Sequence, residues 1–497
     1  MRPGIVVALL ATMATACVVG PNYHPPVQSL PVRWSEVPQN TATSSSAPAQ
    51  WWKTFNDPEL DSLVQRAVSA NLGLQLAEER IREARARRMI AEAPLWPSVN
   101  ATASYSRLLQ DEDLFGPLSA GGQPVLLGAQ PENLFQAGFD ARWELDLFGG
   151  TKRSVEAAQA DVEASFYDRG DVLMTLLAEV ARNYVELRGS QRQLDVARDD
   201  LVAQQDILAL TRARYQGGLA TDLDVARAEA QVKTTGAQIP VVETSYHGAL
   251  HRLGVLLGQW PQTLADELQA SRPIPVAAPF FPSDLPSDLL RQRPDLRRAE
   301  RQLAAATARI GVATAELYPK FSLLGTAGLE SLAASDFFNS SSKLWSIGPS
   351  ITWPIFRGGQ IVAGIEVRDA QEQQALITYR QTILNALEEV ENAFVSYSRE
   401  RDRRDMLVEA VAASDRAAAL ARDRYLGGLS DFLSVLDAQR KLFRAQSELA
   451  LSQAAESDYR VALYKALGGG WEDVAHTNGS QLAQSGNSVP NFPGRRP

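Results

Sequence analysis

The octapeptide R-A-R-Y-Q-G-G-L at residues 212–219 recurs as R-D-R-Y-L-G-G-L at residues 422–429. Both copies keep two arginines, a tyrosine, a double glycine and a leucine at the same spacing. Glycine adopts the left-handed backbone conformation at which helices commonly end, so the double glycine predicts a sharp reversal of the chain. The two octapeptides therefore predict two helical hairpins.

Long segments without helix breakers flank both turns. Residues 365–426 contain no glycine or proline, and residues 151–216 contain only Gly170 and Gly189. At 1.5 Å per residue, the first of these segments would form a helix about 90 Å long. A second helix is predicted after each turn, over 222–257 and 430–467. An isolated coiled-coil rod would also explain these helices, but the segments described next argue against it.

Further landmarks repeat in the same order along the chain. W-E-L-D-L-F-G-G at 143–150 is matched by W-P-I-F-R-G-G at 353–359, and A-P-L-W-P at 93–97 by A-E-L-Y-P at 315–319. The chain therefore contains two copies of one unit. We predict a first repeat over 57–272, a Pro-rich linker over 273–286 and a second repeat over 287–468.

Between these landmarks, the hydrophobic period changes to two. Residues 98–107 place Val99, Ala101, Ala103 and Tyr105 on one face and polar side chains on the other. Similar alternation predicts strands at about 98–107, 134–146, 320–330 and 344–356. About ten residues is the length of a tilted membrane strand, although a soluble sheet with one wet face alternates as well. Two hairpins with aromatic ends favour the wall of a membrane barrel.

Four strands cannot close a barrel, for which about eight is the practical minimum. Open strand edges in lipid leave unpaired backbone groups that cost several kcal/mol each. The chain must therefore associate, and a dimer would supply eight strands while a trimer would supply twelve.

The N-terminus resembles an export signal. Residues 1–16 combine Arg2 with a short apolar run that ends in small residues, and Cys17, the only cysteine, follows directly. Small residues before a cysteine resemble a lipobox, which predicts lipidation of Cys17; an ordinary signal peptide with an unused thiol is the alternative. We predict a lipidated, extended segment over 17–56 and a disordered tail over 469–497, which is rich in Gly, Ser and Asn.

Composition and motifs exclude several other classes of protein. The net charge of −9, from 49 basic and 58 acidic residues, argues against a nucleic-acid binder. No Walker loop, nucleophile elbow or His-Cys cluster occurs. His247 and His251 have a spacing that can bind zinc, but no neighbouring glutamate completes a hydrolase motif. We predict no catalytic residue, no metal site and no cofactor.

Three stretches together resemble the TolC-like outer membrane factor family, most closely its OprM/NodT-type efflux lipoprotein branch. They are C-V-V-G-P-N-Y-H-P-P from residue 17, W-W-x-x-F-x-D-P-E-L from residue 51, and the segment 293–319 that begins R-P-D-L-R-R-A-E-R-Q-L. The resemblance implies an α+β membrane protein of two repeats with four transmembrane strands per protomer. It implies a homotrimer whose twelve-stranded barrel continues into a long periplasmic α-helical barrel. It places the chain in the bacterial outer membrane, anchored in lipid.

The resemblance also implies partners and sites. The partners would be a periplasmic membrane-fusion adaptor and an inner-membrane transporter of the resistance-nodulation-division class. The turns would form periplasmic tips that contact the adaptor through Gly217, Gly218, Leu219, Gly427, Gly428 and Leu429. Acids after the turns would form a periplasmic gate, although helix capping explains them as well. The gate candidates are Asp222, Asp431 and Ser430, which stands where the lipoprotein branch usually has aspartate.

The predicted function is a passive exit duct for drugs or other small toxic compounds. An outer-membrane channel for protein secretion is the alternative, and a soluble periplasmic enzyme is a third possibility that no motif supports. The sequence does not name the transported substrates, because selection would lie in the transporter.

We expect the mature protein to begin at Cys17 and to carry acyl chains there. The intact mass of protein extracted from membranes checks this expectation. A mature N-terminus elsewhere, or a mass without acyl groups, would contradict it.

Overall fold

The computed structural model describes residues 18–27, 30–31, 34–35, 49–109, 119–120, 123–124, 131–277 and 292–471. The predicted signal peptide and Cys17 lie outside the described residues, as do 278–286 of the predicted linker and 472–497 of the predicted tail. The chain divides into two compact units, each assembled from segments that are distant in sequence. Unit 1 takes its described residues from 18–26, 82–163 and 300–377, and unit 2 takes the rest.

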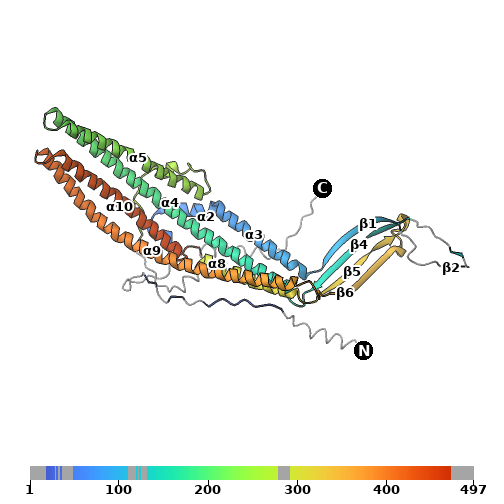
Figure 1. The fold of residues 1–497 in the computed structure, drawn as a ribbon. Helices are drawn as coiled ribbons and strands as arrows, with labels where there is room; N and C mark the ends of the chain where they lie inside the picture. Colours follow the sequence, from blue (N-terminus) through green and yellow to red (C-terminus); the bar gives the residue numbers. More distant parts are fainter. Residues whose placement is uncertain are drawn as a thin grey trace. The chain divides into compact units, whose positions relative to one another are not determined.

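Unit 1 contains a four-stranded antiparallel sheet with the strand order β1-β4-β5-β6 (Figure 1). Its strands are β1 (Ser98–Leu109), β4 (Pro131–Leu145), β5 (Lys320–Ser331) and β6 (Lys343–Thr352). A separate pair joins β2 (Ser119–Ala120) to β3 (Gln123–Pro124). The two hairpins come from the two sequence repeats, and β4 pairs with β5 across them. The predicted fold of four strands and long helices in two repeats is confirmed.

The two faces of this sheet differ in polarity, as the alternation predicts. On one face, Thr102 donates a hydrogen bond to Asp140 (3.1 Å) and Gln136 donates one to Glu330 (2.8 Å). The opposite face exposes large apolar side chains on three of the strands: Val99, Tyr105, Phe139, Trp143, Trp345, Ile347 and Ile351. Because the register pairs even-numbered with even-numbered residues across every ladder, the two polarities stay on separate faces.

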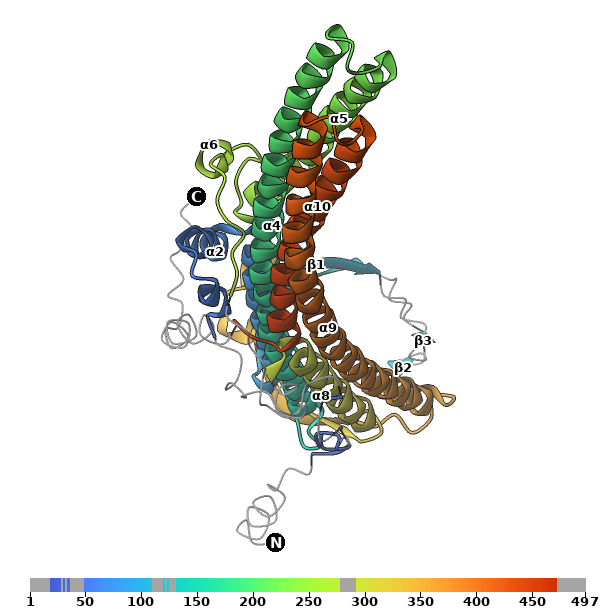
Figure 2. The ribbon, with the colours of Figure 1, turned by 90° about the vertical axis from the view of Figure 1, so that its left-hand side faces the viewer.

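The helices of the two repeats match in length. The long hairpins are formed by α4 (Gly150–Gln216) with α5 (Asp222–Leu256) and by α9 (Gln360–Leu426) with α10 (Phe432–Ala466) (Figures 1 and 2). Both α4 and α9 have 67 residues, and both α5 and α10 have 35. The other helices are α2 (Pro58–Ala70), α3 (Leu72–Glu92), α6 (Ala265–Leu268) and α8 (Pro294–Ala315), with short 3-10 turns η1 (Trp51–Phe55), η2 (Ala93–Leu95), η4 (Ala334–Asp336) and η5 (Ser340–Ser342). Among the described helices, none is both long and apolar enough to cross a membrane.

Single residues determine where α2 ends and how closely α4 packs. Helix α2 ends before Asn71, whose side-chain oxygen accepts a hydrogen bond from the Leu74 amide at the start of α3 (3.0 Å). The long helix α4 continues through Gly170 and Gly189, the two glycines within the predicted helical segment 151–216. A Cβ at either glycine would meet a neighbouring side chain at 3.0 Å or less. These two glycines therefore provide close packing of helix surfaces rather than breaks.

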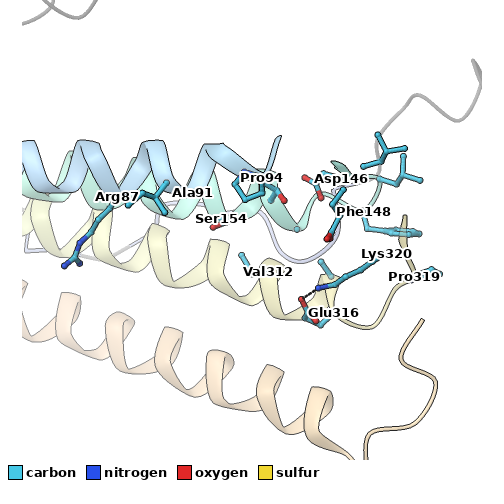
Figure 3. Close-up of a pocket in the computed structure, with 17 residues that line it drawn as sticks. Arg87, Ala91, Pro94, Asp146, Phe148, Ser154, Val312, Glu316, Pro319 and Lys320 are labelled. Atoms are coloured by element: carbon cyan, nitrogen blue, oxygen red, sulfur yellow. Dashed lines mark hydrogen bonds and ion pairs between the residues drawn. The ribbon is translucent and has the colours of Figure 1, made fainter. Parts of the chain in front are cut away.

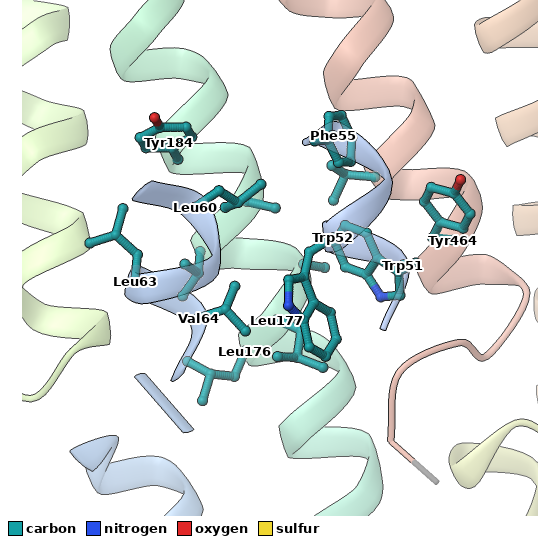
Figure 4. Packing of buried hydrophobic residues seen from close by; sticks show 14 of the residues in the cluster. Trp51, Trp52, Phe55, Leu60, Leu63, Val64, Leu176, Leu177, Tyr184 and Tyr464 are labelled. Carbon is teal, nitrogen blue, oxygen red and sulfur yellow. The ribbon is translucent and has the colours of Figure 1, made fainter. Parts of the chain in front are cut away.

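The core of unit 2 gathers aromatic residues around η1 (Figure 4). Trp51 stacks on Tyr464 of α10 with ring centroids 5.3 Å apart, and it meets Trp52 and Phe55 edge-on. Trp51 and Tyr464 are each 1% exposed. Leucines and valines from α2 and α4 complete this core: Leu60, Leu63, Val64, Leu176 and Leu177. Apolar burial thus joins the start of the first repeat to the end of the second.

Asp57 connects the start of α2 to this core. One of its carboxylate oxygens accepts hydrogen bonds from the amides of Glu59 (2.9 Å) and Leu60 (3.3 Å), which caps the helix. The other oxygen accepts a hydrogen bond from the Tyr184 hydroxyl (2.7 Å). Burial raises the pKa of Tyr184, so the hydroxyl keeps its proton and remains a donor. Asp57-Pro58-Glu59 thus combines a capping side chain, a proline in the first turn and an acid near the helix N-terminus.

The last described residues are packed. The Trp471 indole donates a hydrogen bond to the Gln292 carbonyl (2.9 Å) and meets the Tyr167 ring edge-on at 6.1 Å. The disordered tail was predicted from residue 469, whereas residues 469–471 pack in unit 2. Trp471 can pack there because its indole ring buries a large apolar surface, which polar residues cannot provide.

The N-terminal segment 18–26 is held in unit 1 by a buried arginine. Arg153, which is 3% exposed, donates hydrogen bonds to the carbonyls of Val19 (3.1 Å) and Gly20 (3.2 Å) and to the Asn22 side chain (2.7 Å). The Val19 amide in turn bonds to the Phe148 carbonyl (3.1 Å). The motif V-V-G-P-N-Y is therefore a docked strap.

Replacement of Arg153 by Met should release this strap. Charged hydrogen bonds of this kind contribute about 1.5–3 kcal/mol each, so we expect a lower thermal midpoint and faster protease cleavage within residues 18–26. Arg87→Met is the matched control, because the Arg87 side chain is 74% exposed and pairs with Glu83 one turn away, so its loss should change stability by less than about 0.5 kcal/mol. Equal behaviour of the two variants would show that Arg153 does not hold the strap.

Candidate functional site

The two hairpin turns lie in unit 2 and share one backbone geometry. At the end of α4, the Leu219 amide bonds to the Arg214 carbonyl (2.8 Å) and the Gly218 amide bonds to the Tyr215 carbonyl (2.9 Å). At the end of α9, Leu429 and Gly428 repeat both bonds with Arg424 and Tyr425, at 2.8 and 3.0 Å. This is the Schellman arrangement, which satisfies the last carbonyls of a helix.

Only one glycine of each pair requires its lack of a side chain. Gly218 has φ +76° and Gly428 has φ +71°, in the left-handed region that strains other residues. Gly217 and Gly427 do not have positive φ. A Cβ on either would lie 3.6 Å from its nearest neighbour, an ordinary contact. The sequence predicted the same role for all four glycines, but only Gly218 and Gly428 have the left-handed backbone conformation.

Each turn presents an exposed leucine. Leu219 is 70% exposed and Leu429 is 73% exposed in the isolated chain. Both follow the left-handed glycine directly, so neither can fold back onto its own hairpin core. The leucines at these equivalent positions, with Leu223 and Leu433 also exposed just after the turns, form an apolar feature at each helix end.

The acidic residues after the turns have different roles. Asp431 caps α10, because its carboxylate accepts hydrogen bonds from the Ser434 amide (3.0 Å) and hydroxyl (2.5 Å). These bonds, with that from the hydroxyl the largest, lower the pKa of Asp431 below its ordinary value of 3.8. The capping stabilisation is therefore present above that value and is lost as pH falls through the lowered pKa.

Asp222 does not cap its helix. The cap of α5 is Thr221, which exchanges hydrogen bonds with Asp224 in a reciprocal capping box. Asp222 is the first residue of that helix and is exposed. Capping was the alternative explanation for both acids, and it holds for Asp431 but not for Asp222. Ser430 contributes a buried hydroxyl that has no hydrogen-bond partner in the described part of the chain.

The two hairpins meet near their turns through an apolar cluster with polar contacts beside it. The cluster comprises Ile207 of α4, Ala228 of α5, Tyr425 of α9, and Phe432, Val435 and Leu436 of α10. The Arg214 guanidinium lies over the Tyr425 ring, 4.6 Å from its centroid, and donates to the Leu426 carbonyl (3.4 Å). We call this contact between the hairpins of one chain the tip seam.

The sequence predictions gave no role to any residue of the tip seam. Arg214 and Tyr425 both belong to the repeated octapeptides. A cation and an aromatic ring that recur at a fixed distance from both turns were the available signal. Which arginine meets which tyrosine depends on how the hairpins pack, and no local pattern encodes that.

A pocket of about 460 Å³ lies in unit 1, where strands join helices (Figure 3). The ammonium of Lys320 pairs with Glu316 (2.7 Å), and Asp146 accepts a hydrogen bond from the Lys152 amide (2.8 Å). Phe148 stacks on Tyr318 at 4.6 Å. Lys320 is thus paired, and no nucleophile with a neighbouring base is among the residues that line the pocket, so its geometry does not support catalysis.

His247 and His251 lie on α5 with ring centroids 6.0 Å apart. Within the described residues, no group of three or more His, Cys, Asp or Glu side chains could hold a metal ion. A histidine pair alone supplies too few ligands for a structural or catalytic zinc site.

Comparisons with known proteins agree on one family. Residues 63–259 and 285–469 match the family model described as outer membrane efflux protein. The pyoverdine export outer membrane protein OpmQ of Pseudomonas aeruginosa is 35% identical over 89% of this chain and 91% of its own. Nodulation protein T of Rhizobium leguminosarum bv. trifolii is 31% identical over 93% of this chain and 96% of its own.

Solved structures agree with the fold. The outer-membrane channel OprN superposes with a TM-score of 0.83 at 36% identity, covering 92% of this chain and all of that one. The open state of the Neisseria gonorrhoeae outer membrane channel MtrE gives 0.80 at 28% identity, covering 92% and 99% of the two chains. Both solved structures are outer-membrane channels and OpmQ is an export protein for pyoverdine, and these comparisons do not support the alternative of protein secretion.

The turn geometry predicts unequal effects of alanine at the four glycines. Gly218→Ala and Gly428→Ala should cost about 1–2 kcal/mol because they force a left-handed alanine. Amide exchange at Leu219 and Leu429 should then accelerate about 5- to 30-fold. Gly217→Ala and Gly427→Ala are the controls and should leave exchange at these amides nearly unchanged. Equal acceleration in all four variants would refute the assignment.

Proposed function

This chain belongs to the outer membrane efflux protein family, and on that basis we propose that it forms the trimeric exit channel of a tripartite efflux pump. It would be a passive duct for drugs or other small toxic compounds and would perform no chemistry. The observation that carries the proposal is a sheet with one apolar face and two free edges, built into the same chain as two long helical hairpins.

The trimer is supported by the strand edges. Among the residues that the structure describes, both β1 and β6 pair on one side only. In lipid, their other sides would leave backbone groups unpaired at a cost of several kcal/mol each. Three chains joined edge to edge would supply twelve strands and remove every edge, with the exposed apolar face toward lipid. The polar face, with Asp140, Gln136 and Glu330, would then line a water-filled pore.

The turns are proposed as the adaptor-binding tips. Leu219 and Leu429, on the turns formed by Gly217-Gly218 and Gly427-Gly428, are exposed and lie at equivalent positions. Complete burial of a leucine contributes about 1.5–3 kcal/mol, and three protomers would multiply the contact. The adaptor would be a periplasmic membrane-fusion protein that links this channel to an inner-membrane transporter of the resistance-nodulation-division class.

The periplasmic gate is proposed at Asp222, Ser430 and Asp431, next to the same turns. Three copies of an exposed carboxylate around a narrow opening would attract cations. Asp431 also caps α10, so its replacement by Ala would loosen the start of that helix as well as remove the charge. Asp222 does not cap a helix, so its replacement by Ala would remove the charge without loosening a helix start.

Lipidation of Cys17 remains part of the proposal, supported by the docked strap that follows it in sequence. The proposed class of substrate is supported by what the names of two relatives say that those proteins transport. One is a pyoverdine export protein and another is a toluene efflux pump outer membrane protein of Pseudomonas putida. Both names describe the removal of small molecules, which supports a duct for compounds of that size.

The proposed function predicts a conducting trimer. Native mass spectrometry in detergent should give three chains, and the same preparation should conduct in a planar lipid bilayer. A monomer that still conducts would refute the trimer, and a trimer that never conducts would refute the channel.

The double replacement Leu219→Asp and Leu429→Asp should abolish efflux, measured as antibiotic susceptibility, because charged tips cannot be buried against an apolar partner. Trimer yield and heat stability should change little. Val241→Asp with Met406→Asp is the matched control, since these side chains are 68% and 72% exposed on helices away from the turns. If the tip variant pumps normally, the turns do not dock the adaptor; if it fails to assemble, the leucines are packing residues.

A further inference from the structure

Each of the two octapeptides contains an arginine followed by a tyrosine. Within the described part of one chain, the arginine of the first octapeptide contacts the tyrosine of the second. In the tip seam, Arg214 of the first hairpin lies over Tyr425 of the second. The corresponding residues are Arg424 in the second hairpin and Tyr215 in the first. Tyr425 is 4% exposed, whereas Tyr215 is 47% exposed. Arg424 is exposed and has no side-chain partner in the described part of the chain.

We propose that Arg424 of one copy lies over Tyr215 of the next copy, and that this contact closes the ring of helical tips. The proposal rests on the proposed function, because it requires a trimer. The free arginine is on the second hairpin and the free tyrosine is on the first, so the contact is head-to-tail. Head-to-tail contacts between identical chains generate closed rings when the rotation closes. We call this contact the inter-chain seam.

The inter-chain seam would repeat the geometry of the tip seam with different neighbours. Phe432, which lies 6.0 Å from Tyr425, corresponds to Asp222 in the first hairpin. Ile207 of the apolar cluster corresponds to Ala417. The inter-chain seam therefore replaces an aromatic ring by a carboxylate and a large aliphatic side chain by a small one.

These differences between the two seams determine which interaction stabilises the inter-chain seam. The tip seam buries apolar area, which salt does not screen. At the inter-chain seam, the guanidinium of Arg424 would face a tyrosine ring with the Asp222 carboxylate in the position beside it. Charge complementarity dominates such a contact, and exposed charge pairs weaken with ionic strength. The two hairpins of one chain would therefore stay together while neighbouring chains separate at the tips.

Cysteine cross-linking tests the proposed neighbours. Arg424→Cys with Tyr215→Cys, treated as the assembled trimer with a short bis-maleimide, should give covalent dimers and trimers on a denaturing gel. Arg214→Cys with Tyr425→Cys is the matched control. This pair should link within one chain, so no covalent dimers or trimers should appear on the gel. The parent protein, whose only cysteine is Cys17, sets the background.

The outcomes separate this proposal from the proposed function. A trimer by native mass with no inter-chain product from the 424/215 pair overturns the proposal alone. Inter-chain products from the 214/425 control overturn it as well, because they would reverse the assignment of the two seams. A chain that is not a trimer refutes the proposed function first.

A second measurement does not depend on cross-linking. Tyr215→Ala and Arg424→Gln should each raise the leak conductance of the closed trimer about two- to tenfold, the effect of losing one cation–π contact. The double variant should leak no more than either single variant, because both remove the same contact. Additive effects, or no effect of either change, would overturn the proposal.

Discussion

The reversal of each long helix at one left-handed glycine is the constraint on which the tips depend. A 67-residue helix leaves its last carbonyls without partners, and the turn at Gly218 or Gly428 satisfies them while sending the chain back. The same geometry exposes the following leucine and starts the second helix a few residues later. Exposure at the tip is therefore a consequence of the turn and does not reflect poor packing.

The two repeats share the same backbone structure but differ in many side chains. The helices of the two repeats have equal lengths, and their turns have the same hydrogen bonds. The helix caps differ, since Thr221 with Asp224 serves one helix and Asp431 with Ser434 serves the other. Backbone geometry requires only that some short polar side chain cap each helix, so the choice of residue was free to change. The side chains of the seams diverged in the same way.

The compact units do not coincide with the repeats. Each unit contains matching parts of both, because β4 pairs with β5 across the repeats and because Trp51 near the chain start stacks on Tyr464 near its end. Neither repeat could bury its apolar surface alone. Backbone hydrogen bonding joins the repeats in one unit and aromatic burial joins them in the other.

The sequence by itself determined what depends on local pattern. Alternation predicted the four strands to within a few residues, and the double glycines predicted the hairpins. The Asp-Pro-Glu order at 57–59 is likewise a local helix-start pattern. Composition misjudged Trp471, which fell within the predicted disordered tail, because an aromatic side chain can pack even where the neighbouring sequence is polar. Only the tertiary structure decided which arginine meets which tyrosine, which glycine of each pair is left-handed, and that Arg153 holds the N-terminal strap. The physical reason is that periodicity and turn chemistry act over a few residues, whereas these contacts join residues far apart in the chain and exist only once the helices have packed.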